Sequence, residues 1–269
     1  MEIGVMFWAG RHEMAGIRSL GVECGQLGIR GGIALTPAFV EQWRSALDGF
    51  RLATVVCAFE GESYADIPTV KQTVGFIPQS TRAAREARTR EVSDFAAQLG
   101  VGGIACHIGF VPDDRSDGDY IAVRDTVRRI CDHAAANGQT FALETGQEPA
   151  DVLLRFLDDT GRGNLKINFD PANMILYGTG DPIEALEMLA PHVVSVHAKD
   201  GDWPPRSSTG ALGRERRLGE GAVGIGRFVE TLKRIGYAGT VNIEREGADR
   251  DQWTQDVRAA AALLRRLAG

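Results

Sequence analysis

Four side chains that bind divalent metal ions occupy equivalent places in the sequence, each at the end of a short apolar segment. Carboxylates gathered in a buried site raise one another's pKa, so a cation is needed to keep them ionised. Three carboxylates with one imidazole suit Mn²⁺, the expected ion, as well as Mg²⁺ or Co²⁺, and Zn²⁺ is a further alternative. The predicted ligands of this site are Glu144, Asp170, His197 and Glu244.

The alternation of polar and apolar residues in these segments explains why the four side chains would meet. Successive side chains on a strand point to opposite faces, so Ile167 and Phe169 share one face while Asn168 and Asp170 share the other. In a closed barrel the large apolar side chains face the surrounding helices and the polar ones face the axis. Each polar series ends at the carboxyl end of its strand, which is where barrel enzymes hold their active sites. His107 occupies the same position at the end of a neighbouring segment.

Segments of strand type alternate with segments of helical period along the whole chain. Eight strand–helix units in 269 residues predict an α/β fold of the (β/α)8 TIM barrel type, one domain spanning residues 1–269. A doubly wound open sheet is the rival, but no early strand is followed by a GxGxxG or GxxxxGK[ST] phosphate loop, and we interpret GAVGIG at 221–226 as a turn. The predicted strands are 3–9, 22–27, 53–59, 103–108, 140–145, 165–170, 193–198 and 240–245.

The composition narrows the classes of function. The net charge of −6 at pH 7 argues against duplex nucleic acid or an anionic membrane as a partner. No apolar run reaches the roughly 20 residues of a membrane helix, and the N-terminus MEIGVMFWAG lacks the basic region of a secretory signal. The four cysteines form no CxxC pair, so we expect reduced thiols in a cytoplasmic protein. His12, His133 and His192 are interpreted as surface residues.

Several motifs resemble those of the xylose isomerase-like TIM barrels, the family of sugar phosphate isomerases and epimerases. They are ALETGQE (142–148), NFDPAN (168–173), VHAKDGDWP (196–204), LGEGAVGIGRF (218–228) and VNIERE (241–246). The resemblance implies that Glu144, Asp170, His197 and Glu244 bind the metal. In the ketose 3-epimerases of this superfamily, the glutamates that match Glu144 and Glu244 are also the acid/base pair. The resemblance also implies a homo-oligomer.

Two departures from the ketose 3-epimerases concern the residues that contact substrate. Asn173 stands where those enzymes carry the histidine of a DxxH motif, and Trp203 stands where they place an arginine six residues after the metal histidine. Asparagine hydrogen-bonds but carries no charge, so substrate placement must differ. The candidate substrate-binding residues are His107, Asn173, Lys199 and, as a substitute for the missing arginine, Arg206.

Three long connections, 60–80, 109–118 and 199–224, are expected to leave the same face of the barrel as lids over the site. The third carries a basic run of Arg214, Arg216 and Arg217. This run is either a phosphate contact or a solvated loop, so the sequence leaves open whether the substrate is phosphorylated.

These features together predict a divalent-metal-dependent sugar isomerase or epimerase that acts on a ketose or keto-sugar through a metal-stabilised enediolate. Glu144 and Glu244 would exchange the protons. The alternative is a metal-dependent lyase or dehydratase of a keto-sugar or inosose on the same scaffold. A more remote alternative is an apurinic-site endonuclease, which the net charge opposes. A catalytically inactive sugar-binding protein is the third.

Overall fold

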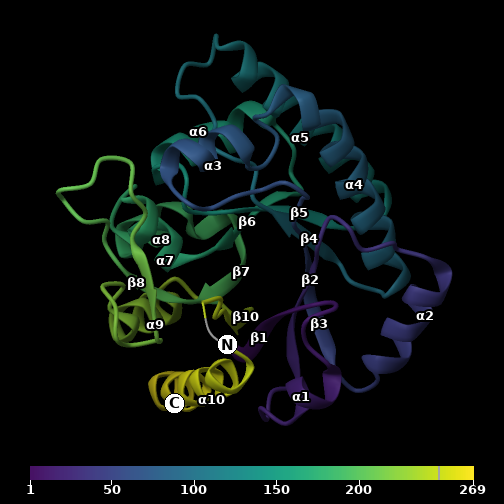
Figure 1. Cartoon of the computed structure of the whole chain (residues 1–269), viewed down its shortest axis with the longest axis vertical. Coiled ribbons are helices and arrows are strands. Elements are labelled where there is room, and N and C mark those ends of the chain that lie inside the picture. The colour runs from purple at the N-terminus through teal and green to yellow at the C-terminus, as the bar shows by residue number, and fades with distance from the viewer. Residues whose placement is uncertain (248) are drawn as a thin grey trace.

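Eight parallel strands close into a barrel, and the helices lie outside it (Figure 1). The computed structural model describes residues 1–247 and 249–269. Around the barrel the strands follow the order β1-β10-β7-β6-β5-β4-β3-β2. Each strand lies within two residues of its predicted bounds, so the predicted (β/α)8 barrel is confirmed. The strands are β1 (Glu2–Trp8), β2 (Cys24–Ile29), β3 (Arg51–Cys57), β4 (Gly103–Cys106), β5 (Thr140–Glu144), β6 (Leu165–Phe169), β7 (Val193–Ala198) and β10 (Thr240–Ile243).

The helices connect successive strands and bury their apolar faces against the outside of the sheet. In α5, for example, Val123, Val127 and Ile130 recur at helical spacing and are all buried. Within 1–247 and 249–269, no helix is both long and apolar enough to cross a membrane. The helices are α1 (Met14–Arg18), α2 (Pro37–Ala46), α3 (Ile67–Thr73), α4 (Gln79–Gln98), α5 (Gly118–Ala136), α6 (Ala150–Thr160), α7 (Pro171–Tyr177), α8 (Pro182–Leu189), the 3₁₀ turn η1 (Ala190–His192), α9 (Ile225–Arg234) and α10 (Arg250–Ala268).

The sheet separates an apolar core, which lies between the sheet and the helices, from the interior of the barrel, which is partly polar. Between sheet and helices the core is apolar, with Phe141, Ile167 and Phe169 fully buried in it. A second, smaller apolar cluster fills one side of the barrel interior with short side chains, among them Ala105 and Ala142. The alternation predicted for the strands is therefore confirmed. The buried polar residues of the barrel interior include Gln26, Asn168, Ser195, His197 and Asn242.

Two of the three long connections carry structure that the sequence does not predict. The connection after β3 contains α3, and the connection after β7 contains an antiparallel ribbon of β8 (Asp200–Asp202) and β9 (Arg214–Arg216). The two connections meet, because the backbone N–H of Ile67 donates to the carbonyl of Gly210 at 2.9 Å. Val70, Val74 and Tyr177 form an apolar cluster with Leu212 beside this contact. The strand segments β8 and β9 have three residues each, too short for a recognisable alternation.

Asp200, at the start of β8, organises the glycine-rich loop that precedes α9. Its buried carboxylate accepts backbone N–H groups from Gly201 and Gly219 (both 2.9 Å), Gly221 (3.0 Å) and Val223 (3.1 Å). Gly221 approaches so closely that a Cβ there would lie 2.3 Å from the carboxylate, so a larger residue would displace Asp200. The loop is thus a turn, as predicted, built around an internal anion.

Candidate metal centre

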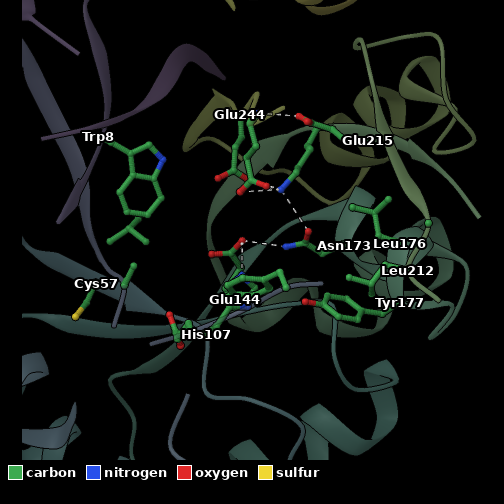
Figure 2. Close-up of a pocket in the computed structure, with 17 residues that line it drawn as sticks. Trp8, Cys57, His107, Glu144, Asn173, Leu176, Tyr177, Leu212, Glu215 and Glu244 are labelled. Atoms are coloured by element: carbon green, nitrogen blue, oxygen red, sulfur yellow. Dashed lines mark hydrogen bonds and ion pairs between the residues drawn. The ribbon is translucent and has the colours of Figure 1, made fainter. Parts of the chain in front are cut away.

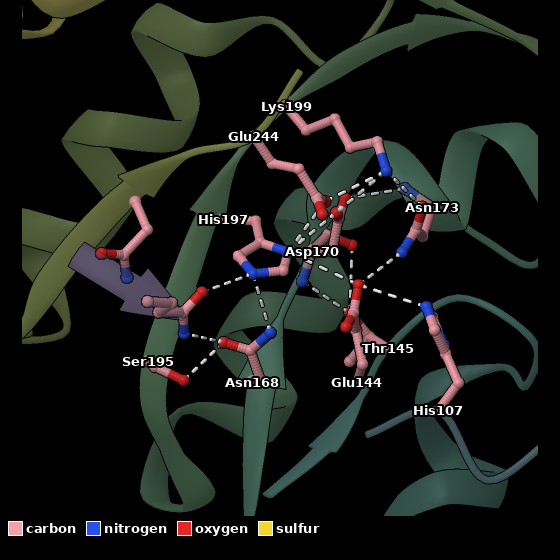
Figure 3. A network of polar contacts seen from close by, with 12 residues as sticks. His107, Glu144, Thr145, Asn168, Asp170, Asn173, Ser195, His197, Lys199 and Glu244 are labelled. Carbon is pink, nitrogen blue, oxygen red and sulfur yellow. Dashed lines mark hydrogen bonds and ion pairs between the residues drawn. The ribbon is translucent and has the colours of Figure 1, made fainter. Parts of the chain in front are cut away.

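The four predicted ligands converge at the carboxyl ends of four adjacent strands (Figure 3). Glu144 ends β5, Asp170 follows β6, His197 lies in β7 and Glu244 follows β10. One ligand atom from each residue lies within 4.8 Å of the ligand atoms of the other three, and all four side chains are buried. Asp170 also caps α7, since its Oδ1 accepts the backbone N–H of Asn173 at 2.9 Å, which leaves Oδ2 directed at the cluster. The cluster is positioned to bind a metal ion.

His197 presents its Nδ1 to the three carboxylates. That nitrogen lies 3.1 Å from Glu244, 3.2 Å from Asp170 and 3.4 Å from Glu144. Its other ring nitrogen, Nε2, lies 2.7 Å from the side-chain oxygen of Gln26, which can only accept a hydrogen bond, and 3.1 Å from the amide nitrogen of Asn168. The shorter contact is with an acceptor, which favours the hydrogen on Nε2; in that neutral form the lone pair of Nδ1 faces the carboxylates, as a metal ligand requires.

Two further contacts fix the orientation of the Gln26 amide. Its Nε2 donates to Oδ1 of Asn168 at 3.0 Å, and the hydroxyl of Ser195 donates to the same oxygen. All three residues are buried, and Figure 3 shows Asn168 and Ser195 beside His197. Gln26 comes from β2, on the far side of the barrel from β7, so it joins the centre only through the closure of the sheet.

The charged groups of the cluster compensate one another. Burial opposes protonation of His197, but the carboxylates of Glu244 and Glu144 outweigh it and raise the pKa of this ring well above its usual value. Burial likewise favours neutral Glu144, but His107 and His197 outweigh burial and lower its pKa. Each group thus stabilises the charge of an oppositely charged neighbour. An oxygen-rich set with one imidazole, in which every ligand atom is buried, fits a divalent cation.

Asn173 and Lys199 connect the two glutamates of the cluster. The amide nitrogen of Asn173 donates to Oε1 of Glu144 at 3.0 Å, and its oxygen accepts from Lys199 at 3.4 Å. Lys199 in turn donates to Oε2 of Glu244 at 3.1 Å. Burial opposes the charge of Lys199, but Glu244 and Glu246 outweigh it and raise its pKa well above the usual value, so Lys199 stays a cation. We name this chain of contacts, Glu144–Asn173–Lys199–Glu244, the carboxylate bridge.

A cavity of about 300 Å³ lies beside the cluster at the mouth of the barrel (Figure 2). Of the predicted substrate-binding residues, His107, Asn173 and Lys199 line it. Arg206 is exposed and is not among the lining residues, so the structure does not bring it to the site. The lining residues that sequence reasoning did not identify include Trp8, Glu62, Tyr64, Tyr177, Glu215 and Glu246.

Comparison with known proteins identifies the family to which this fold belongs. The sequence profile of the xylose isomerase-like TIM barrel family matches residues 15–267. The chain belongs to this family. It is 42% identical to a xylose isomerase domain protein from Planctomyces limnophilus, with a TM-score of 0.93 over 99% of this chain and 96% of that one. No curated protein matches the sequence.

More distant xylose isomerase-like barrels share the fold. A D-psicose 3-epimerase, solved in the presence of D-fructose, is 20% identical with a TM-score of 0.71 and full coverage of both chains. A probable 3-DHS dehydratase from Bacillus anthracis is 17% identical, also with a TM-score of 0.71, over 98% of this chain and 99% of that chain. The structures similar to this xylose isomerase-like barrel thus include both epimerases and a dehydratase.

In this xylose isomerase-like barrel, the segment after β5 holds His107 against the cluster. Nδ1 of His107 lies 3.1 Å from the amide nitrogen and 3.3 Å from the amide oxygen of Gln147, and its Nε2 lies 3.3 Å from Glu144. Burial opposes protonation, but Glu144 outweighs it and raises the pKa of His107 to about 9. The next residue, Glu148, accepts the backbone N–H of Val111 at 2.7 Å. The ETGQE motif (144–148) therefore supplies one candidate metal ligand, Glu144, and two residues that support the pocket, Gln147 and Glu148.

Proposed function

We propose that this protein is a divalent-metal-dependent isomerase or epimerase of a ketose or keto-sugar, with Glu144 and Glu244 as its acid/base pair. The proposal assigns the activity to one domain, residues 1–269. The observation that carries it is the arrangement of the two buried glutamates. They come from β5 and β10, on either side of the ligands contributed by β6 and β7, and both line the cavity.

Glu144, Asp170, His197 and Glu244 would hold the metal ion. The chemistry supplied there by a bound divalent cation is Lewis-acid stabilisation of the negative charge on the oxygens of a carbonyl compound that loses a proton from the adjacent carbon. We propose Mn²⁺, with Mg²⁺, Co²⁺ and Zn²⁺ as alternatives, because the donor set is mostly oxygen.

The two glutamates would move the protons. One carboxylate removes the proton from the carbon beside the carbonyl, and the other returns a proton to the opposite face of that carbon or to the neighbouring carbon. The first outcome is epimerisation and the second is aldose–ketose isomerisation. The carboxylate bridge orients both groups, since Asn173 contacts Glu144 and Lys199 contacts Glu244. His107, Asn173 and Lys199 each present a polar atom to the cavity and would orient the substrate hydroxyl groups.

Deuterium exchange tests this proposal. The Mn²⁺-loaded protein is incubated in D₂O with a panel of ketoses, and proton NMR follows deuterium at the carbons next to the carbonyl. We expect exchange that disappears in Glu144→Gln and in Glu244→Gln. Glu220→Gln is the matched control, because Glu220 is exposed and lies outside the cavity lining. The position of the label distinguishes an epimerase from an isomerase.

Two results would contradict the proposal. Exchange that persists in both glutamate variants would place the chemistry elsewhere. No exchange with any ketose, while metal binding is verified, would exclude simple enolisation of free ketoses. The appearance of an enone absorbance with a cyclic keto-sugar would then identify a lyase on the same scaffold.

A further inference from the structure

We infer that the cavity takes an uncharged polyhydroxy carbonyl compound, such as a free ketose or a keto-glycoside, and rejects sugars that carry a phosphate or another anionic group. This inference rests on the proposed function of the site and names its substrate class. Three features of the structure support it: the glycine-rich loop, the charges of the cavity and the positions of the arginines.

The glycine-rich loop before α9 is where many TIM barrels bind phosphate, since that site is formed after the seventh and eighth barrel strands at a helix N-terminus. Here β7 is the seventh strand along the chain and α9 follows the loop. The N–H groups of Gly219, Gly221 and Val223 would be the phosphate donors, but all three donate to the carboxylate of Asp200. These backbone donors are thus taken by an internal anion, and none of the three residues lines the cavity, so the loop offers no free donor to a substrate phosphate.

The cavity itself is acidic. Five glutamates line it, namely Glu62, Glu144, Glu215, Glu244 and Glu246. Its cationic lining residues are already paired with carboxylates: Lys199 with Glu244 at 3.1 Å and Glu246 at 3.5 Å, and His107 with Glu144 at 3.3 Å. Among the described lining residues none is an arginine. Apart from the proposed metal ion, which Glu144 and Glu244 would hold, the described lining residues offer no unpaired cation to a dianionic group.

The arginines of the long connection after β7 do not supply positive charge to the cavity. Arg216 pairs with Asp202, and Arg217 pairs with Asp256 at 2.9 Å. Arg206 and Arg214 are exposed and lie outside the cavity lining. The basic run that the sequence offered as a phosphate contact is therefore a partly paired, solvated segment.

The side chains that line the cavity suit a neutral sugar. Trp8 forms one side, and Leu176 and Leu212 lie on the opposite side, with the glutamates between them (Figure 2). Apolar walls accommodate the C–H faces of a sugar, while carboxylates and amides accept or donate hydrogen bonds to its hydroxyl groups. The carboxylate of Glu246, 56% exposed, stands near the opening as a hydroxyl acceptor that also repels anions.

Matched pairs of ligands test the inference without relying on turnover. The Mg²⁺-loaded protein is titrated with D-fructose and D-fructose 6-phosphate, with D-ribulose and D-ribulose 5-phosphate, and with inorganic phosphate. Binding is read from the fluorescence of Trp8, and Trp8→Phe identifies the part of the signal that arises in the cavity. We expect each phosphorylated sugar to bind at least about tenfold more weakly than its neutral partner. Glu246→Gln should narrow that gap.

The outcomes separate this inference from the proposed function. Neutral ketoses that bind but exchange no deuterium would leave the substrate class standing and overturn the isomerase proposal. A phosphorylated sugar that binds as tightly as its neutral partner, or more tightly, would overturn the substrate class. Failure of every neutral sugar to bind at its highest soluble concentration would overturn it as well.

Discussion

His197 donates its Nε2–H to the side-chain oxygen of Gln26 across the barrel interior, over 2.7 Å. The two residues come from β7 and β2, which are not neighbours in the sheet. With Nε2 directed at Gln26, and at the amide nitrogen of Asn168 at 3.1 Å, Nδ1 of His197 faces the carboxylates. Gln26 is therefore a positioning residue for the metal centre, although it does not line the cavity.

Replacing Gln26 with leucine should weaken metal binding. Loss of the acceptor lets the His197 ring change tautomer or rotate, and such outer contacts typically contribute about 10- to 100-fold to metal affinity. Calorimetric titration of the metal-free protein with Mn²⁺ measures the effect. Gln139→Leu is the matched control, because Gln139 is also buried but contacts Ser93 and Val101, away from the centre. Equal Mn²⁺ affinity of Gln26→Leu and the wild type would contradict the assigned tautomer.

Lys199→Met should make the protein depend on metal for its stability. The substitution removes one of the two cationic partners of Glu244, the other being the ring of His197, and breaking a buried ion pair costs about 3–5 kcal/mol in the free energy of unfolding. Added Mn²⁺ supplies positive charge, so it should raise the melting temperature of Lys199→Met more than that of the wild type. Lys199→Arg keeps the charge and should behave more like the wild type. An equal Mn²⁺ effect on all three proteins would show that Lys199 does not balance the charge of the cluster.

Asp200→Ala should destabilise the glycine-rich loop and create affinity for anions. The variant loses the acceptor of four backbone N–H groups, and loss of so buried a charged acceptor costs about 3–5 kcal/mol. Inorganic phosphate should then raise the melting temperature of the variant more than chloride at equal ionic strength. Asp202→Ala is the control, because its ion pair with Arg216 is exposed and contributes at most about 1 kcal/mol. If phosphate raises the melting temperature of Asp200→Ala no more than chloride does, these N–H groups do not form an anion site.

Acid should destabilise the protein partly through His12. This ring stacks on Trp253 with centroids 4.4 Å apart, and its Nδ1 accepts the backbone N–H of Trp8 at 3.0 Å. Burial, aided by Arg11 and neighbouring arginines, lowers its pKa from 6.5 to about 4. The unfolded chain therefore binds a proton at a higher pH than the folded protein does, so this contribution to stability is complete above pH 6.5 and declines toward pH 4.

His12→Phe keeps an aromatic ring against Trp253 but cannot titrate. Urea denaturation at several pH values should show a smaller loss of unfolding free energy between pH 6.5 and pH 4 in this variant than in the wild type. His133→Phe, at a partly exposed site paired with Asp94, serves as the comparison. Identical pH dependence of His12→Phe and the wild type would show that His12 does not contribute.

The barrel and the cluster were predictable because both depend on local patterns. Alternation along β6 and β7 fixes which side chains face the axis, and the ends of the strands place Asp170 and Glu244 at one mouth. The contacts of Gln26 and His12 were not predictable, because they arise from residues distant in sequence. Interpreting His12 as a surface residue was wrong, since the ring is half-buried against Trp253. Arg206 was chosen as a loop substitute for the arginine of the ketose 3-epimerases, and loop conformation left it exposed.

The four hydrogen bonds to Asp200 have a consequence for ligand recognition. A loop whose donors are satisfied within the chain holds its conformation whether or not a ligand is present. Ordering a flexible segment during binding would oppose association by roughly 1–2 kcal/mol for each residue fixed. Because this loop is ordered in advance, it supports β8 and its partner strand β9, whose Glu215 lines the cavity. A sugar that enters the cavity therefore meets a preformed wall at Glu215, and its affinity reflects direct contacts rather than the entropy of loop closure.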